Sequence, residues 1–454
     1  MYNKSSFMNI SYFKEKKIFL FSIFLFFLIR IFFFQKGLNF NSFGFWQIAN
    51  LNLLKEDLIK TIYYFHYQPP LWNMLIGSII KMTGQSEDLA KNILLLIHWS
   101  FSIGILFVIY KLKIKLDFNN KIFFICLLTT ILNPSLIFFE NFALYNHFSC
   151  FIFFLIFYNF YLLTESKNIK YEYYILFLSL ILTWTWPIFH PIFIIIIFFL
   201  ITYLKNIFEI KSLIISLVFF SLSLTPSIKN KYEFNFFGNG SGLGQNMSGL
   251  VYWNDDLREK CSYNNLSENI DKNSKYREKI KHPGLLYENH VQNSIQALDK
   301  SGYCLKNSIH EIKNNFSKYF FYRLRVLLAS HNRFSFEYFQ PPKNFNNYFD
   351  FFNKLKKEDY LWAIKKILIN LFFSFYYLTL IFYFFKIKDN QNFKKASLCI
   401  FLLHIYILVI GTFLNNQEQE RFRYTSGIFL NFLFFYIIFK FNYFLRKFFD
   451  YKKY

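Results

Sequence analysis

One acidic and several polar residues interrupt an otherwise apolar segment, NPSLIFFENFALYNHF. Glu140, Asn141 and Tyr145 fall at helical spacing in it, so they can share one helix face. Ionisable side chains at membrane depth are costly and usually face a cavity or a partner. A buried carboxylate also binds a proton more readily, which suits a general base. We expect Glu140 to be that base and Asn141 and Tyr145 to bind substrate; the alternative is that Glu140 lies in the outer interface without a catalytic role.

A second cluster of charges lies in the short connection NNQEQERFRY. We expect this connection on the outer face, where arginine is disfavoured without a reason because positive residues gather in cytoplasmic loops. The planar guanidinium groups of Arg421 and Arg423 match a phosphate group. The alternative is a turn closed by ion pairs to Glu418 and Glu420.

Two proline-rich turns carry further candidate residues. His66 and Gln68 precede the double proline of FHYQPPLWN, which favours a helix start. His190 lies in the turn WTWPIFHP. We expect His66 and Gln68 to orient an acceptor or a phosphate, and His190 to contact substrate. The alternative is that both turns are purely structural: they start helices and place tryptophans in the membrane interface.

A glycine-rich segment, FGNGSGLGQNMSG, follows one of the apolar runs. It lacks the Gly-Lys-Ser/Thr ending of a phosphate-binding loop and does not follow a soluble strand. We interpret it as a flexible loop near the active face that could act as a gate.

These side chains need a scaffold of membrane-spanning helices. The chain has 454 residues, of which 54% are hydrophobic and only 17% are charged, below the roughly 25% of soluble domains. Apolar runs of about 17–25 residues recur along it, which excludes a single soluble globule and a disordered chain. The net charge of +23 gathers in lysine-rich connections and follows the positive-inside rule, so we do not expect nucleic acid as a partner.

We therefore predict an all-α polytopic membrane protein with about ten or eleven transmembrane helices. Residues 1–228 form a first membrane module, whose first outer loop at 35–70 holds interfacial helices. Residues 229–358 form a small outer-face domain, and 359–454 form the last three spans. Both termini lie in the cytoplasm if segment 70–84 does not cross the membrane by itself, a point that the sequence leaves open.

The five cysteines have no metal-binding spacing. Cys261 and Cys304 are the only two in the outer-face domain, and an oxidising compartment would allow them to form a disulfide. No metal or cofactor is demanded by the candidate residues, although a divalent cation is left open.

The order of these motifs resembles the integral-membrane GT-C glycosyltransferases, nearest to protein O-mannosyltransferases and lipid A aminoarabinose transferases. Members carry an arginine near the end of the first span, here Arg30, then an outer loop with interfacial helices and a Pro-Pro-Leu motif, here residues 69–71. Pro134 and Glu140 loosely match a later connection and its acidic residue. The acids and arginines of 418–423 match a Glu-X-X-Arg-like motif before the last spans.

The resemblance implies an enzyme of the bacterial cytoplasmic membrane that transfers a sugar from a polyprenyl-phosphate donor at the outer face. The acceptor would be an envelope glycan, lipid or protein, and Arg421 or Arg423 would stabilise the leaving phosphate. The family usually carries an aspartate early in the first outer loop, but NFNSFGFWQIA has no acid here. Asp57 or Glu140 must then supply the base, or the chain is an inactive relative.

Three other functions remain open at this point. An O-antigen polymerase or ligase would depend on the outer-face domain rather than on Glu140. A transporter of lipid-linked saccharides would need inverted repeats or several charges at mid-membrane; His98 and His404 are the few mid-span candidates. A non-catalytic membrane scaffold would need no base at all.

Overall fold

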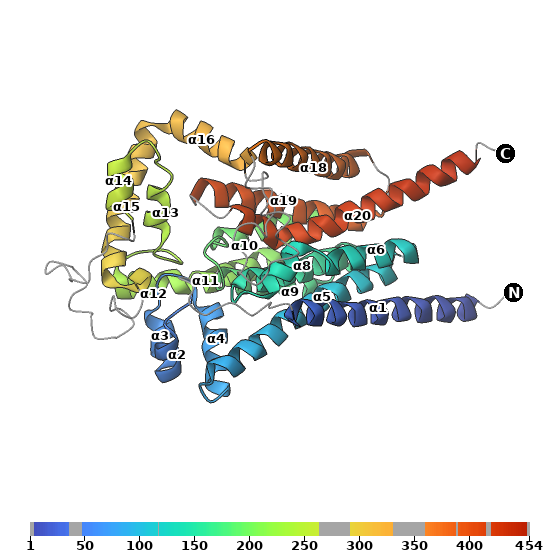
Figure 1. The fold of residues 1–454 in the computed structure, drawn as a ribbon, viewed down its shortest axis with the longest axis horizontal. Coiled ribbons are helices and arrows are strands. Elements are labelled where there is room, and N and C mark those ends of the chain that lie inside the picture. The colour runs from blue at the N-terminus through green and yellow to red at the C-terminus, as the bar shows by residue number, and fades with distance from the viewer. Residues whose placement is uncertain are drawn as a thin grey trace.

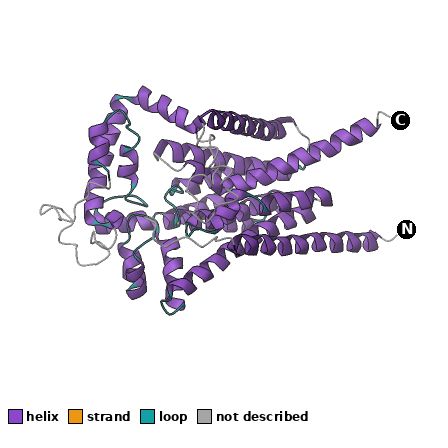
Figure 2. Cartoon of the chain, viewed as in Figure 1, coloured by secondary structure: helices purple, strands orange, loops and turns teal. Residues whose placement is uncertain are grey.

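A computed structural model describes residues 4–35, 48–116, 118–262, 291–329, 359–386, 389–414 and 419–451 of the chain. Helices dominate this part of the chain, and it contains no strand (Figure 2). Several of the helices are long and apolar enough to cross a membrane. The prediction of an all-α polytopic membrane protein is therefore confirmed.

The helices follow one another with short connections. The first half of the chain forms α1 (Lys4–Gln35), α2 (Leu51–Glu56), α3 (Leu58–Tyr64), α4 (Pro70–Met82), α5 (Glu87–Leu116), α6 (Asn120–Ile131), α7 (Pro134–Glu140), α8 (Tyr145–Ser166), α9 (Ile169–Thr183), α10 (Ile192–Lys205) and α11 (Ile210–Ser223). The second half forms α12 (Thr225–Phe234), α13 (Leu243–Ser248), α14 (Asp255–Lys260), α15 (Ile295–Asn314), α16 (Phe316–Ala329), α18 (Asp359–Lys386), α19 (Gln391–Leu414) and α20 (Gln419–Tyr451).

Helix α8 lies at the centre of the bundle and packs against α5, α9, α19 and α20 (Figure 1). It is apolar on nearly all sides, as expected for a helix surrounded by others. The ring of Phe157, for example, lies 5.7 Å from that of Phe393 on α19 and 4.2 Å from that of Phe429 on α20. Segments far apart in the sequence are thereby held around one core.

Six helices in the described part of the chain are long and apolar enough to cross a membrane: α5, α8, α11 continued by α12, α18, α19 and α20. A seventh arises if α6 and α7, bent by 48° at their junction, count as one span. This number is lower than the ten or eleven predicted. Helices α9 and α10 have 15 and 14 residues, fewer than the roughly 20 that a membrane span needs, and the described side chains of α1 carry charges near both ends. The larger number stays a prediction.

The described part of the predicted first outer loop, residues 48–70, forms short helices at one end of the bundle (Figure 1). Helix α4 begins at Pro70, as the double proline predicted, and has 13 residues. At 1.5 Å per residue it is about 20 Å long, too short for a hydrocarbon core of about 30 Å. Segment 70–84 therefore does not make an independent crossing, which agrees with termini on one side of the membrane.

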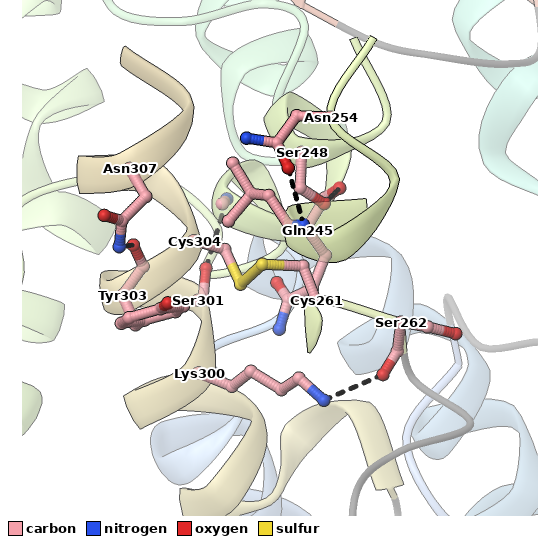
Figure 3. The surroundings of a disulfide bond; sticks show 12 residues. Gln245, Ser248, Asn254, Cys261, Ser262, Lys300, Ser301, Tyr303, Cys304 and Asn307 are labelled. Carbon is pink, nitrogen blue, oxygen red and sulfur yellow. Dashed lines mark hydrogen bonds between the residues drawn. A yellow bond between two sulfur atoms is a disulfide. The ribbon is translucent and has the colours of Figure 1, made fainter. Parts of the chain in front are cut away.

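Helices α13, α14 and α15 form a small unit beyond the same end of the bundle (Figure 1). Cys261, which follows α14, is joined to Cys304 on α15 by a disulfide that spans 43 residues of sequence (Figure 3). Lys300 donates to the carbonyl of Ser262 at 2.9 Å beside it. The pairing that the sequence left open is thus present, whereas residues 263–290 and 330–358 of the predicted outer-face domain lie outside the described residues.

Both termini lie at the opposite end of the bundle from this unit (Figure 1). Away from the unit of α13, α14 and α15, buried ion pairs join helices: Lys113 on α5 binds Glu15 on α1 at 2.9 Å, and Lys205 on α10 binds Glu172 on α9 at 2.5 Å. Lys440 on α20 pairs with Asp389, which precedes α19. Each pair ties separate helices together and leaves its charges compensated.

Candidate functional site

A buried ion pair between α1 and α7 lies inside the bundle. The Nε atom of Arg30 lies 2.5 Å from Oε2 of Glu140, and its Nη2 atom donates to Oε1 at 2.9 Å. Both side chains are at most 1% exposed. The bidentate geometry matches the planar guanidinium to the carboxylate, which is the arrangement in which a buried pair is best compensated.

The bend between α6 and α7 places these two residues together. Asn133 caps α7 by accepting from the backbone amides of Ser135 and Leu136, and Pro134 occupies its first turn. The break leaves the carbonyl of Ile131 without its usual partner in a continuous helix. Nη1 of Arg30 donates to that carbonyl at 2.9 Å. The helix break therefore creates an acceptor for the guanidinium as well as positioning Glu140.

A chain of hydrogen bonds continues from Glu140 across three helices. The hydroxyl of Ser102 on α5 donates to Oε1 of Glu140 and lies 3.0 Å from Nε2 of His147 on α8. That nitrogen also donates to the carbonyl of His98 at 2.9 Å, which places the proton on Nε2. Nδ1 of His147 then accepts from the Tyr424 hydroxyl at 2.8 Å.

This network changes the interpretation of Glu140. Its carboxylate accepts from two nitrogens of Arg30 and from Ser102, and it is fully buried. A general base must reach the proton that it abstracts. Glu140 is therefore positioned as a counter-ion that holds α1, α5 and α7 together, and its catalytic role stays a prediction.

A small aromatic cavity lies beside this network. Tyr145 and Trp186 line it with ring centroids 5.1 Å apart, and Phe422 lies 5.3 Å from Trp186 on the other side. Gln68 adds an amide whose Oε1 lies 3.5 Å from the Tyr145 hydroxyl, and Asn246 adds a second amide. The cavity measures about 120 Å³. Aromatic faces with a few polar groups are typical of a site for a small polar ligand, and we call it the aromatic cavity.

The glycine-rich segment closes one side of the aromatic cavity and is fastened there. A Cβ atom on Gly240 would lie 2.6 Å from the carbonyl oxygen of Tyr67, and one on Gly242 would lie 2.8 Å from the Tyr67 ring. The amide of Ser241 donates to the His66 carbonyl at 2.9 Å, and its hydroxyl lies 2.7 Å from Nδ1 of His66. These close contacts correct the expectation of a flexible loop, because the segment is packed against the first outer loop.

His66 therefore occupies a supporting position. Its side chain is fully buried, and its ring packs edge-on against Phe234 at 4.9 Å. Its backbone amide donates to the Asn293 side chain at 2.8 Å, which ties this turn to the segment just before α15. Gln68 reaches the aromatic cavity, whereas His66 fixes the loop behind it.

A larger cavity of about 410 Å³ lies among α6, α7, α18, α19 and α20. Its walls are largely aromatic and aliphatic, and Arg423 is the one charged residue among its lining residues. Arg423 is 4% exposed and lies over the Phe373 ring at 4.5 Å. His404 joins the same wall, with Nε2 2.9 Å from the Tyr377 hydroxyl and Nδ1 2.8 Å from the Ser426 hydroxyl. We call it the arginine cavity.

Three consecutive residues of α20 contact the aromatic cavity, the arginine cavity and the hydrogen-bond network of Glu140. Phe422 lines the aromatic cavity, Arg423 lines the arginine cavity, and Tyr424 reaches His147 and stacks on Phe139 at 4.1 Å. Successive residues of a helix point about 100° apart, so one turn can face three environments. The first turns of α20 thus connect both cavities with the buried ion pair.

The remaining predicted residues are not brought together. Asp57 caps α3 by accepting from the amide of Lys60 at 3.2 Å, is about half exposed, and does not line either cavity. Asn141 ends α7 and donates to the Ile137 carbonyl at 2.7 Å.

His190 lies in the turn before α10, where partial burial lowers the pKa of its imidazole. The backbone of Arg421 belongs to α20, but its side chain lies outside the described residues, as do Glu418 and the side chain of Glu420.

Several residues of the network escaped the sequence interpretation. Ser102 was not singled out, although it lies four residues after His98 on α5 and so shares its face. Tyr424 is part of the charged connection, but only the arginines and glutamates of that connection were considered as functional residues. Arg30 was identified only as a match to a family motif, and its pairing with Glu140 was not predicted. The one available signal was that both are charged residues inside apolar runs, and such residues often pair with each other.

The described residues contain no group of three or more His, Cys, Asp or Glu side chains that could hold a metal ion. Comparison of the chain with protein-family models, with curated proteins and with solved structures finds no match.

Proposed function

We propose that this protein is a glycosyltransferase that takes a sugar from a polyprenyl-phosphate donor at the outer face of the membrane. The observation that carries the proposal is the pair of cavities on either side of the start of α20: one is apolar with a single guanidinium, and the other is small, aromatic and lined by amides. A lipid-linked sugar has the same division into an apolar chain, a phosphate and a polar ring.

The arginine cavity suits the lipid and its phosphate. Its aromatic and aliphatic walls match an isoprenoid chain, and Arg423 offers charge-assisted hydrogen bonds to a phosphate. No carboxylate stands among its lining residues in the described part of the chain, and Arg423 brings a positive charge to its wall. An anion bound there would be stabilised, and so would the charge that develops when the phosphate leaves.

The aromatic cavity suits the sugar. The faces of Trp186 and Tyr145 can stack on the C–H side of a sugar ring, and the amides of Gln68 and Asn246 can bind hydroxyl groups. Its volume is on the scale of one monosaccharide rather than an oligosaccharide.

The disulfide between Cys261 and Cys304 supports an outer-face location for this end of the molecule. Disulfides persist in oxidising compartments, and this one lies in the unit beyond the cavities. The lysine-rich connections would then lie in the cytoplasm, as the positive-inside rule requires. The acceptor would enter from the outer compartment as an envelope glycan, lipid or protein.

A second candidate function is a binding or transport protein for lipid-linked saccharides. One observation favours it: no described residue that lines either cavity is an acid, and Glu140 is engaged by Arg30. Catalysis then needs a base from elsewhere, such as Asp57 or a residue outside the described part of the chain. Binding of the donor needs none.

The test uses purified protein in lipid nanodiscs with radiolabelled polyprenyl-phosphate sugars. Arg423→Met should weaken donor binding by about 10–100-fold, since a hydrogen bond to a charged group contributes about 1.5–3 kcal/mol. Arg323→Met is the matched control, because Arg323 is also buried but donates to the Thr412 carbonyl and lines neither cavity. Equal binding by wild type and Arg423→Met, or an equal loss in Arg323→Met, would refute the assignment.

Transfer to a cell-envelope extract separates the two functions. Wild type, Glu140→Gln and Asp57→Asn are compared, with a known transferase as a positive control in the same extract. Loss of transfer in Asp57→Asn with folding retained would identify a base. Donor binding without any transfer by wild type would favour the binding or transport function.

A further inference from the structure

A basic hollow lies at the end of the bundle where the termini are found. It measures about 790 Å³ and lies where the start of α1 meets the end of α5 and the start of α6. Four lysines line it: Lys14 and Lys17 from α1, Lys113 from α5 and Lys121 from α6. It is separate from both cavities described above and shares no residue with them.

The charge of the hollow is positive. Lys113 is buried and pairs with Glu15 at 2.9 Å, and the exposed Lys14, Lys17 and Lys121 add three lysine side chains from two helices. The first turn of α6 adds partial positive charge from its backbone amides. Asn119 caps this turn by accepting from the Lys121 amide at 2.7 Å. No carboxylate stands among the lining residues in the described part of the chain.

The floor of the hollow is apolar. Ile18, Phe21 and Phe124 line it below the lysines, and the rings of Phe21 and Phe124 lie 6.2 Å apart. Phe21 is 54% exposed on the outside of the bundle, where a membrane would surround it. Lysine ammonium groups next to exposed apolar side chains are complementary to a molecule with an anionic headgroup and hydrocarbon tails. A soluble anion would use only the upper half of such a site.

We propose that this hollow binds the headgroup of an anionic phospholipid in the leaflet opposite the disulfide-bonded unit, with a bisphosphate lipid of the cardiolipin class as its best ligand. Three lysines from two helices can contact two phosphate groups at once, and the acyl chains then follow Phe21 and Phe124. Basic pockets between transmembrane helices on the cytoplasmic side bind such headgroups. The lipid would hold α1 against α6 and thereby support the helix that carries Arg30.

The test is native mass spectrometry of the detergent-purified chain with added tetraoleoyl cardiolipin. Dioleoylphosphatidylcholine and inorganic pyrophosphate serve as the zwitterionic lipid and the tail-free anion. We expect cardiolipin to bind at concentrations at which the other two do not. The triple variant Lys14→Gln/Lys17→Gln/Lys121→Gln should need at least about tenfold more cardiolipin for half occupancy, because each lysine near the headgroup contributes a separate attraction.

The matched control neutralises three exposed lysines elsewhere, as Lys167→Gln/Lys170→Gln/Lys211→Gln. It should bind cardiolipin as wild type does. Unchanged binding by the first triple variant, an equal loss in the control, or equal binding of pyrophosphate would overturn the proposal. If the triple variant does not fold, Lys121→Glu alone is measured, and wild-type affinity in that variant would overturn it as well. None of these outcomes depends on glycosyl transfer.

Discussion

Breaking the buried pair of Arg30 and Glu140 should destabilise the protein far more than it alters any substrate contact. In Glu140→Gln, the guanidinium of Arg30 stays buried at 1% exposure and keeps the carbonyl of Ile131, but its counter-charge is gone. Removing one partner of a buried pair costs about 3–5 kcal/mol, because an uncompensated charge remains inside. Ser102 also loses a charged acceptor.

A double variant, compared with the two single variants in a double-mutant cycle, removes both charges. Arg30→Met/Glu140→Gln leaves no buried ion, and replacing a buried pair by neutral groups of similar size is often close to neutral. We therefore expect the double variant to recover most of the stability that either single variant loses. The coupling free energy between the two sites should be about 3 kcal/mol or more.

Thermal unfolding can be followed with a thiol-reactive dye, because three free cysteines are fully buried and react only on unfolding. They are Cys126, Cys150 and Cys399. An unfolding entropy of about 2.1 cal/mol/K per residue gives about 1 kcal/mol/K for a chain of this length, so a loss of 3–5 kcal/mol lowers Tm by about 3–5 °C. Glu172→Gln is the control: it leaves Lys205 paired with Glu209, so it should lower Tm less than Glu140→Gln does.

The reasoning fails if Glu140→Gln unfolds at the wild-type temperature, or if the double variant is no more stable than the single ones. Either result would mean that the carboxylate is not the structural counter-ion of Arg30. A Glu140→Gln variant of full stability without transfer activity would instead restore Glu140 as the base.

Three further predictions rest on other parts of the structure. Replacing Cys261 and Cys304 by serine opens a loop of 43 residues and should cost about 4 kcal/mol by the chain-entropy relation, measured by the same unfolding assay without reductant; unchanged Tm would contradict it. Gly244→Ala should destabilise by about 1–3 kcal/mol, because its Cβ overlaps a carbonyl of α15, whereas Gly302→Ala has open space and should not; equal Tm values for the two variants would argue against the packed loop. Burial lowers the pKa of His190, so the unfolded chain binds the extra proton first and stability falls as pH drops through about 6.5; His190→Gln should flatten Tm between about pH 7.5 and 5.5, and an unchanged pH profile would count against it.

The sequence predicted the features that depend on local pattern. Long apolar runs indicate membrane helices, and the double proline predicted that a helix starts there, as α4 does at Pro70. The charged residues inside those runs were harder to interpret. Glu140 reads as a lone buried acid because its partner, Arg30, lies 110 residues away in the chain. Only the packing of α1 against the broken helix α6–α7 brings the two together.

The same reason explains the error about the glycine-rich segment. Glycine allows both mobility and close packing, and the sequence does not show which applies. Gly240 and Gly242 contact Tyr67, some 170 residues earlier in the chain, so these glycines allow close packing. One local prediction was also wrong: α7 ends at Glu140 and α8 begins at Tyr145, so Glu140, Asn141 and Tyr145 do not share one helix face. Roles that depend on distant partners were not predicted either.

The pairing of Arg30 with Glu140 also limits where chemistry can occur. Once these two charges compensate each other, Arg423 is the one charged residue among the described residues that line the aromatic cavity and the arginine cavity. The guanidinium of Arg423 can bind an anion, whereas the described lining residues of these two cavities offer no carboxylate as a base. Under the proposed function, donor binding should therefore survive any change at Glu140 that leaves the fold intact, and transfer would need an acid brought to the aromatic cavity. A variant set that separates binding at Arg423 from transfer at that acid would locate the missing base.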